Sequence, residues 1–237
     1  MNVGKSIQQS IDVYLKNFGI LISACLITGL VSVFSVGILA GPLVGGVLIL
    51  GLKILRGEPG KLTEIFAHFD QLVPTLVATL ILWGVGLIFW IIGIIPVIGM
   101  VISFVATPVL SLLYFLVIGF IVDQKMRPLE AVKRSCDYFA AEPLQLWLYS
   151  LAMMILGGIG AIIFLVGVFL TMPLGMMGMI IDYQRLSTKE TPLFEPGKQT
   201  LRIAGTALAV LFITGVICWA LGIERISYPA FLFQSAR

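Results

Sequence analysis

Four long stretches of this chain carry no charged residue, and they constrain its fold more than any other feature. They lie between Asn17 and Lys53, between Asp70 and Asp123, between Glu142 and Asp182, and between Arg202 and Glu224. A helix that crosses a membrane needs about 20 apolar residues. Each of the first three stretches is long enough for two such helices, and the fourth fits one. We therefore predict an all-α integral membrane helical bundle with seven transmembrane helices.

The composition excludes a soluble globular domain. The 237 residues are 59% hydrophobic and only 11% charged, whereas about 25% of the residues in a soluble domain are charged. A soluble domain of this length leaves many residues at its surface, so it could not hide this much apolar surface from water. The net charge of +3 does not indicate a nucleic-acid partner, because the basic residues stand in short loops together with acidic ones.

Glycine and proline interrupt each of the first three uncharged stretches near its middle. The interruptions are Gly41-Pro42, Pro96 followed by Gly99, and Thr171-Met172-Pro173 after a run of glycines. Proline lacks a backbone N–H and clashes with the preceding turn, so it ends or kinks a helix. We predict three helical hairpins whose turns reach the interface or are buried by neighbouring helices. In the third stretch, the alternative is that Pro173 kinks the sixth transmembrane helix.

Lysine and arginine are concentrated before the first predicted transmembrane helix and in the loops that join the hairpins. The three hairpin turns contain none, and only Arg225 and Arg237 follow the seventh transmembrane helix. Cytoplasmic loops of membrane proteins carry an excess of these residues. This distribution places the N-terminus and the charged loops in the cytoplasm and the C-terminus outside.

The charged loops resemble one another, which indicates an internal repeat. Residues 56–59, 125–128 and 189–192 each read basic-x-x-Pro. The segment 10–14 is also similar to the segment 135–139. We predict one unit used three times, in which a short interfacial helix precedes a hairpin. The alternative is that interfacial loops of membrane proteins simply look alike.

The predicted units occupy residues 1–58, 59–127 and 128–190, and residues 191–237 add a loop, the seventh transmembrane helix and an external tail. In the third unit, the apolar face of the interfacial helix is predicted to consist of Leu129, Val132, Cys136 and Phe139, which stand at helical spacing.

These interfacial helices are predicted to lie on the cytoplasmic leaflet with their apolar residues toward the hydrocarbon. Lys61 and Lys133 would then point to lipid headgroups, and His68 and Arg134 lie on the same two segments. The alternative is that each segment extends the following transmembrane helix into water.

The predicted transmembrane helices have no ionisable residue except at their ends, which argues against catalysis and proton coupling. His68 is the only histidine, and no HExxH pattern is present. Serines within these helices have no histidine or carboxylate nearby in sequence to act as a base. We predict no enzymatic activity, no metal site and no cofactor.

Glycine and proline also mark a candidate path for a solute. Its residues are Gly41, Pro42, Pro96, Pro108 and Pro173. Transporters place substrate sites where Gly/Pro breaks in repeated units free backbone groups. Such a path admits only uncharged or weakly polar solutes. The alternative is close helix packing through small residues.

Several short segments carry a resemblance to a known group: residues 10–18, Gly41-Pro42, residues 131–135 and residues 171–173. The chain resembles a broad group of bacterial inner-membrane proteins, which includes the membrane domain attached to some glycerophosphodiester phosphodiesterases. The resemblance covers about residues 5–187 and implies a six-helix unit in the bacterial cytoplasmic membrane. It supplies no catalytic residue, and the hydrolase domain that some members carry is not in this sequence.

Two classes of function follow from these patterns. The first is a non-enzymatic membrane protein that acts through lipids, a protein partner or a second copy of itself, such as an accessory subunit or an envelope-maintenance component. The second is a transporter or channel for a weakly polar or lipid-like solute. A continuous polar-lined cavity between the units would favour transport, and an exposed apolar groove would favour the first class.

Overall fold

The computed structural model describes residues 3–92, 98–160, 164–188, 202 and 205. Every element within these residues is a helix and none is a strand, which confirms the all-α fold. In chain order the elements are α1 (Val3–Lys16), α2 (Phe18–Phe34), α3 (Ala40–Leu55), η1 (Leu62–Phe66), η2 (Phe69–Gln71), α4 (Leu72–Ile92), α5 (Ile98–Gln124), α6 (Pro128–Ala141), α7 (Pro143–Gly158) and α8 (Phe164–Ser187), where η denotes a 3-10 helix.

Two segments are long and apolar enough to cross a membrane. They are Leu62–Ile91, which contains most of α4, and Val101–Gln124 within α5. The number rises to four if the bent pairs α1–α2 and α6–α7 each count as one crossing. α3 is a shorter apolar helix of 16 residues, and such a helix is about 24 Å long against a hydrocarbon core of about 30 Å. The predicted seventh transmembrane helix lies outside the described residues.

Sharp bends separate the two amphipathic helices from the apolar helices that follow them. α1 meets α2 at 93°, and α6 meets α7 at 105°. Both α1 and α6 have 14 residues. Each buries a serine, Ser10 or Ser135, whose hydroxyl donates to the carbonyl four residues earlier. These segments are therefore distinct helices and not straight extensions. The segment before α4 differs, because it forms the two 3-10 turns η1 and η2.

The first hairpin turns over residues 35–39, between α2 and α3. Val36 and Gly37 have positive φ angles of 52° and 80° in this turn. Gly41 and Pro42 come after it, in the first turn of α3. A proline is tolerated there because the first N–H groups of a helix have no partner within it. The turn of the second hairpin, with Pro96, lies outside the described residues.

The third hairpin turns earlier than the break at Thr171-Met172-Pro173. α7 ends at Gly158 and α8 begins at Phe164, so Pro173 lies inside α8. Pro108 likewise lies inside α5. Pro173 thus lies within a helix and not in a turn, as in the alternative interpretation.

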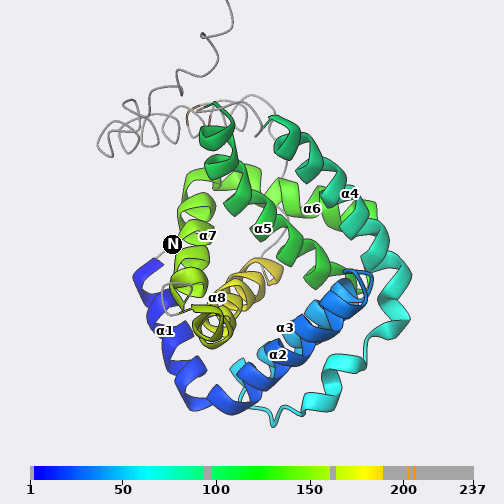
Figure 1. Ribbon diagram of the computed structural model, residues 1–237, viewed down its shortest axis with the longest axis vertical. Helices are drawn as coiled ribbons and strands as arrows, with labels where there is room; N and C mark the ends of the chain where they lie inside the picture. The colour runs from blue at the N-terminus through cyan, green and yellow to red at the C-terminus, as the bar shows by residue number, and fades with distance from the viewer. Residues whose placement is uncertain (1–2, 93–97, 161–163, 189–201, 203–204, 206–237) are drawn as a thin grey trace, which may run out of the picture.

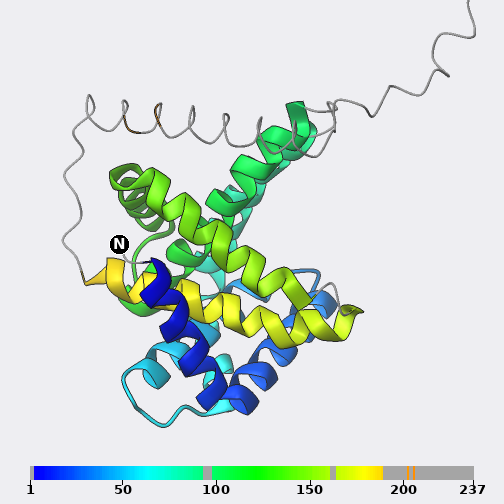
Figure 2. The same cartoon turned by 90° about the vertical axis from the view of Figure 1, so that its left-hand side faces the viewer.

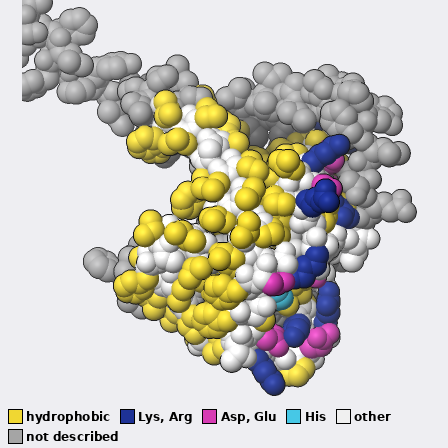
Figure 3. Space-filling model, turned by 90° about the vertical axis from the view of Figure 1, so that its right-hand side faces the viewer, with side chains coloured by type: hydrophobic (Ala, Val, Ile, Leu, Met, Phe, Trp, Pro, Cys, Tyr) yellow, Lys and Arg dark blue, Asp and Glu magenta, His cyan; other side chains and the backbone are white. Residues whose placement is uncertain are grey.

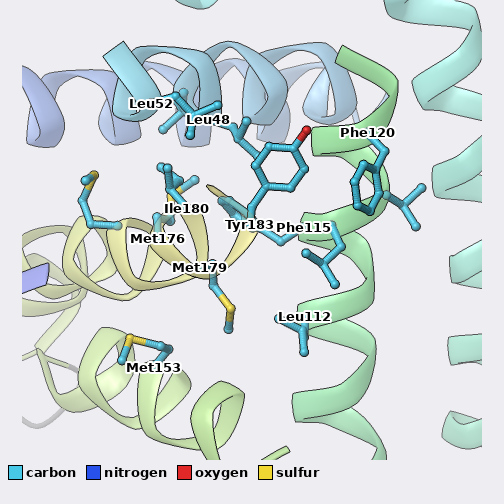
Figure 4. Close-up of a cluster of buried hydrophobic side chains, with 14 of the residues drawn as sticks. Leu48, Leu52, Leu112, Phe115, Phe120, Met153, Met176, Met179, Ile180 and Tyr183 are labelled. Carbon is cyan, nitrogen blue, oxygen red and sulfur yellow. The ribbon is translucent and has the colours of Figure 1, made fainter. Parts of the chain in front are cut away.

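The helices α5 and α8 occupy the centre of the bundle (Figure 1). α5 packs against α3, α4, α6 and α7, whereas α8 packs against α1, α2, α3 and α7. Figure 2 shows α7 and α8 lying side by side. The buried cluster between these helices includes Leu48, Leu112, Phe120, Ile180 and Tyr183 (Figure 4).

Glycines permit the closest contacts between the elements of this bundle. A Cβ atom added to Gly46 of α3 would lie 2.3 Å from the carbonyl oxygen of Ile65 in η1. A Cβ atom on Gly175 of α8 would lie 2.8 Å from the carbonyl oxygen of Met153 in α7. Small residues let helix backbones approach closely in membranes, where helix association depends on such packing.

Hydrophobic side chains cover much of the face drawn in Figure 3, and the charged side chains gather along one edge of it. On α4, Leu80, Trp83, Leu87 and Trp90 are among the exposed hydrophobic residues. We call the segments 53–71, 123–142 and 182–188, which hold most of the described charges, the charged edge. An apolar surface beside a charged rim is typical of a protein that sits in a lipid bilayer.

Candidate functional site

Two neighbouring cavities share residues at the middle of α5, and together we call them the midplane groove. The first compartment, of about 470 Å³, is lined by Leu82, Trp83 and Gly86 of α4 and by Thr107, Leu110, Ser111 and Tyr114 of α5. The second compartment, of about 300 Å³, is lined by Val44 of α3, Ser111, Tyr114 and Phe115 of α5, Met153, Met154 and Gly157 of α7, and Met172, Gly175, Met176 and Met179 of α8. Ser111 and Tyr114 line both compartments.

The position of Ser111 along α5 sets the depth of the groove. α5 runs from Ile98 to Gln124, so Ser111 is its central residue, 13 residues from either end. At about 1.5 Å of rise per residue, that is roughly 20 Å from each helix end. If α5 crosses a bilayer, the groove lies near the bilayer midplane.

Methionine dominates the second compartment. Five of the nine methionines in the sequence line it: Met153, Met154, Met172, Met176 and Met179. Methionine is flexible and polarizable, and it adapts its shape to different apolar surfaces. Met154 and Met172 are exposed, so this compartment opens to the surface of the bundle. Its lining is suited to a flexible apolar chain.

Hydroxyl groups at the centre of α5 give the first compartment a weakly polar character. Thr107 donates to the carbonyl of Ser103 at 2.7 Å. Tyr114, whose side chain also carries a hydroxyl, lies in the lining. Ser111 has no hydrogen bond to any described residue. None of the residues that line either compartment is charged, and burying an unpaired charge so far from water is costly. The groove can therefore hold only an uncharged ligand.

A larger cavity of about 510 Å³ lies at the charged edge, where Ala141, Glu142, Pro143, Leu144 and Gln145 line it together with Arg202 and Gly205. This cavity shares no lining residue with the midplane groove.

The candidate path residues that the structure describes do not line the midplane groove. Pro42, Pro108 and Pro173 are all buried, and none of them lines either compartment. A Cβ atom on Gly41 would lie 2.7 Å from the Cβ atom of Thr75. Gly41 therefore serves close packing of α3 on α4. Pro96 lies outside the described residues.

Aromatic side chains hydrogen-bond to the backbone just before each of the two prolines inside helices. The indole Nε1 of Trp147 on α7 donates to the carbonyl of Val105, three residues before Pro108, at 3.1 Å. The hydroxyl of Tyr14 on α1 donates to the carbonyl of Leu170, three residues before Pro173. A proline lacks the N–H that would bond the carbonyl four residues earlier, here that of Phe104 or Phe169. The aromatic donors bond the neighbouring carbonyl in the same disturbed turn of each helix.

The predicted interfacial residues lie at the charged edge, but with different surroundings. Lys61 and Lys133 are exposed, as expected for side chains that point to headgroups or water. Arg134 is half-buried: its Nη1 donates to Gln124 at 2.7 Å, and its guanidinium lies 4.8 Å from the centroid of the Phe120 ring. Arg134 therefore joins α6 to the end of α5.

His68 lies between η1 and η2, ahead of α4, and is half-buried. Burial, and then the positive charge of Lys125, lower the pKa of His68 below its ordinary value of 6.5. Neighbouring Asp70 accepts a hydrogen bond from Gln71 and forms a 2.9 Å ion pair with Lys125. These two contacts, in that order, lower the pKa of the Asp70 carboxyl. His68 is thus neutral and Asp70 charged at neutral pH.

Further ion pairs and hydrogen bonds join the elements at the charged edge. Lys53 pairs with Glu64 at 2.9 Å, and Asp182 and Glu142 flank Arg185 at 3.7 and 3.4 Å. The Asp123 carboxylate accepts a 2.8 Å hydrogen bond from the hydroxyl of Tyr183. These contacts link helix ends to one another. Among the described residues, no cluster of three histidine, cysteine or acidic side chains could hold a metal ion.

Sequence reasoning did not find the midplane groove. Ser111 and Tyr114 stand in an ordinary apolar run, and only the packing of α4, α5, α7 and α8 brings their neighbours together. One signal in the sequence was the concentration of methionine, with five residues between Met153 and Met177 in addition to Met179.

No protein family, no curated protein and no solved structure matches this chain. The resemblance to the membrane domain of glycerophosphodiester phosphodiesterases therefore stays a prediction.

Proposed function

We propose that this chain is a non-enzymatic integral membrane protein that acts by holding an uncharged lipid in the midplane groove. The observation that carries the proposal is the groove itself, which is apolar, free of charge and open at the surface. An exposed apolar groove favours a protein that acts through lipids or partners. Lipid-binding sites are mostly apolar with a few polar groups that orient the ligand.

The membrane setting is part of this proposal. Two to four helices are long and apolar enough to cross a membrane, and exposed hydrophobic residues such as Trp83 and Trp90 need an apolar solvent. We propose seven transmembrane helices in three related units, located in the bacterial inner membrane with the charged edge in the cytoplasm. The matching lengths and bends of α1–α2 and α6–α7 support the relation between the first and third units.

This topology has a direct test. A C-terminal alkaline phosphatase fusion should be active and a C-terminal fluorescent fusion dark, because the C-terminus is proposed to lie outside the cytoplasm. The opposite pair of results would exclude seven transmembrane helices.

Transport of a weakly polar or lipid-like solute is the second candidate. It is favoured by the depth of the groove and by its lining, which comes from helices of all three hairpins, because transporters place their sites at such positions. However, the carbonyls of Val105 and Leu170, close to the prolines, already accept hydrogen bonds from Trp147 and Tyr14. They are thus engaged in holding the bundle together, which favours the first candidate.

Two glycines of α4 provide a matched pair for testing the groove. Gly86 lines the first compartment, and a Cβ atom there would meet only Leu110, at 4.0 Å. Gly84 has nothing within 4 Å of an added Cβ and is exposed. Gly86→Leu therefore fills the groove without a backbone clash, whereas Gly84→Leu adds the same side chain at an exposed position outside the groove lining.

The experiment is mass spectrometry of lipids that stay bound when the protein is purified in a mild detergent. We expect Gly86→Leu to lose most of the bound lipid and Gly84→Leu to retain it. Equal lipid retention in the wild type and both variants would refute the groove as the lipid site.

A further inference from the structure

The two compartments of the midplane groove differ in chemistry, and this difference indicates a ligand with two unlike parts. Trp83 and Thr107 line only the first compartment. Five methionines and Phe115 line only the second, and Ser111 and Tyr114 lie at the junction and line both. A ligand that fits both has a flat, weakly polar part and a flexible apolar part.

Ser111 provides the most specific feature of the first compartment. Among the other hydroxyls on the described apolar helices, Ser23 donates to Gly19, Thr79 to Thr75, and Thr107 to Ser103. Thr28 and Ser32 of α2 have no partner among the described residues, but neither lines the groove. Ser111 makes no hydrogen bond with any described residue, although it is only half-buried. A hydroxyl left unpaired in hydrocarbon is unfavourable. The Ser111 hydroxyl can therefore donate a hydrogen bond to an acceptor inside the groove.

The depth of Ser111 limits what this acceptor can be. Ser111 is the central residue of α5, roughly 20 Å from each helix end at ~1.5 Å per residue. A phospholipid headgroup would carry its charge into the hydrocarbon to reach it, which is strongly unfavourable. A plain hydrocarbon chain reaches this depth but offers no acceptor. A neutral ring with carbonyl oxygens meets both conditions.

The aromatic lining supports a ring as the ligand. Aromatic rings prefer to stack on or edge against other rings. Trp83 and Tyr114 line the compartment from α4 and α5, and Gly86 leaves space near them because it has no side chain. The ring of Trp83 packs against the backbone at Gly37, where an added Cβ atom would lie 2.9 Å from the ring.

We propose that the midplane groove binds an isoprenoid quinone. The quinone ring occupies the first compartment, where a carbonyl oxygen accepts a hydrogen bond from Ser111, and the isoprenoid chain occupies the methionine-lined second compartment. This inference rests on the proposed function, because it names the lipid that the groove holds.

The test uses the purified full-length protein and a short-chain quinone, decylubiquinone, whose binding is followed by quenching of tryptophan fluorescence. Loss of one hydrogen bond weakens binding by roughly two- to tenfold, so Ser111→Ala should raise the Kd by that factor. Ser23→Ala is the matched control, because the Ser23 hydroxyl bonds to its own helix, and it should leave the Kd unchanged. Alanine is a better helix former than serine, so both variants should fold.

The bound lipids of the wild type and of Gly86→Leu separate the two proposals. Quinone retained by the wild type and lost in Gly86→Leu supports both. If Gly86→Leu instead loses bound phospholipid, and Ser111→Ala leaves the quinone Kd unchanged, the quinone proposal is refuted and the proposal of a lipid-binding groove is retained. Lipid retention that Gly86→Leu does not alter overturns both.

Discussion

The hydrogen bond from Tyr14 to the carbonyl of Leu170 offers the sharpest test of how this bundle is held together. Tyr14 is 7% exposed, and it connects α1 to the turn of α8 that precedes Pro173. Tyr14→Phe removes only the hydroxyl and keeps the ring, whose edge-on contact with Phe18 has a centroid distance of 5.3 Å. The variant therefore isolates one donor without creating a large cavity.

The expected cost follows from the environment of this bond. Hydrogen bonds between membrane helices contribute about 0.6 kcal/mol on average and up to about 1.7 kcal/mol. The Leu170 carbonyl stands in a turn disturbed by proline, so the upper half of this range applies. We expect Tyr14→Phe to lower the free energy of unfolding by about 1–1.7 kcal/mol, which is about a 5- to 20-fold change in the folding equilibrium.

The assay is reversible unfolding in mixed micelles with increasing denaturing detergent, followed by circular dichroism. The same substitution is then made in a Pro173→Ala background, where residue 173 regains an N–H for the Phe169 carbonyl. The proline ring no longer holds the turn open there, so the Leu174 N–H can bond the Leu170 carbonyl. There the cost of Tyr14→Phe should fall to less than half. An equal cost in both backgrounds, or no cost in the wild type, would show that the tyrosine does not compensate for the proline.

Three further predictions concern other parts of the molecule. Gly46→Ala should destabilise the protein by about 2 kcal/mol or more in the same unfolding assay, because the added Cβ would lie 2.3 Å from the Ile65 carbonyl oxygen. The control is Gly19→Ala, which has nothing within 4 Å of the added Cβ and should be neutral or stabilising. Equal effects of the two substitutions would contradict the close contact of α3 with η1. Folding lowers the pKa of His68 below its ordinary value of 6.5, so the contribution of neutral His68 to the free energy of unfolding is fully present above pH 6.5 and declines as the pH falls toward the folded-state pKa. His68→Gln should remove this decline. An unchanged pH profile in the variant would count against the burial of His68. In a Cys218→Ser background, a maleimide should label exposed Cys136 and leave buried Cys25 unmodified, so rapid labelling of Cys25 would contradict the packing of α2.

The sequence predicted the helical class correctly because the uncharged stretches admit no other element. It also predicted the short amphipathic helices before α2 and α7, since the polar residues around Ser10 and Ser135 interrupt the apolar runs. The sequence was less informative before α4, where the same basic-x-x-Pro pattern is followed by 3-10 turns.

The face of α6 that packs on the bundle was not visible in the apolar spacing. Leu129 and Cys136 of the predicted lipid-facing side are exposed, as a lipid-facing prediction requires. The buried residues are Ala131, Ser135 and Tyr138. In a protein surrounded by lipid, an apolar side chain is equally stable facing outward, so the packed face is selected by small size and hydrogen bonding.

The paired acids at the helix ends illustrate the same limit. Asp182 lies beside Arg185, which stands three residues later in the sequence. Asp123 instead accepts its hydrogen bond from Tyr183, which is 60 residues away. A pairing along one helix turn can be read from spacing, whereas a pairing between α5 and α8 depends on how these helices cross.

The sequence by itself determined that the chain is helical and apolar, with its charges before, between and after the long uncharged stretches, because these properties follow from composition and from the local rules of helix breaking. Only the tertiary structure decided that Pro108 and Pro173 lie within helices next to aromatic donors, and that Ser111 lines a groove with five methionines. These features join residues far apart in the chain, and their energies arise from close packing and hydrogen bonds between helices, which no local pattern encodes.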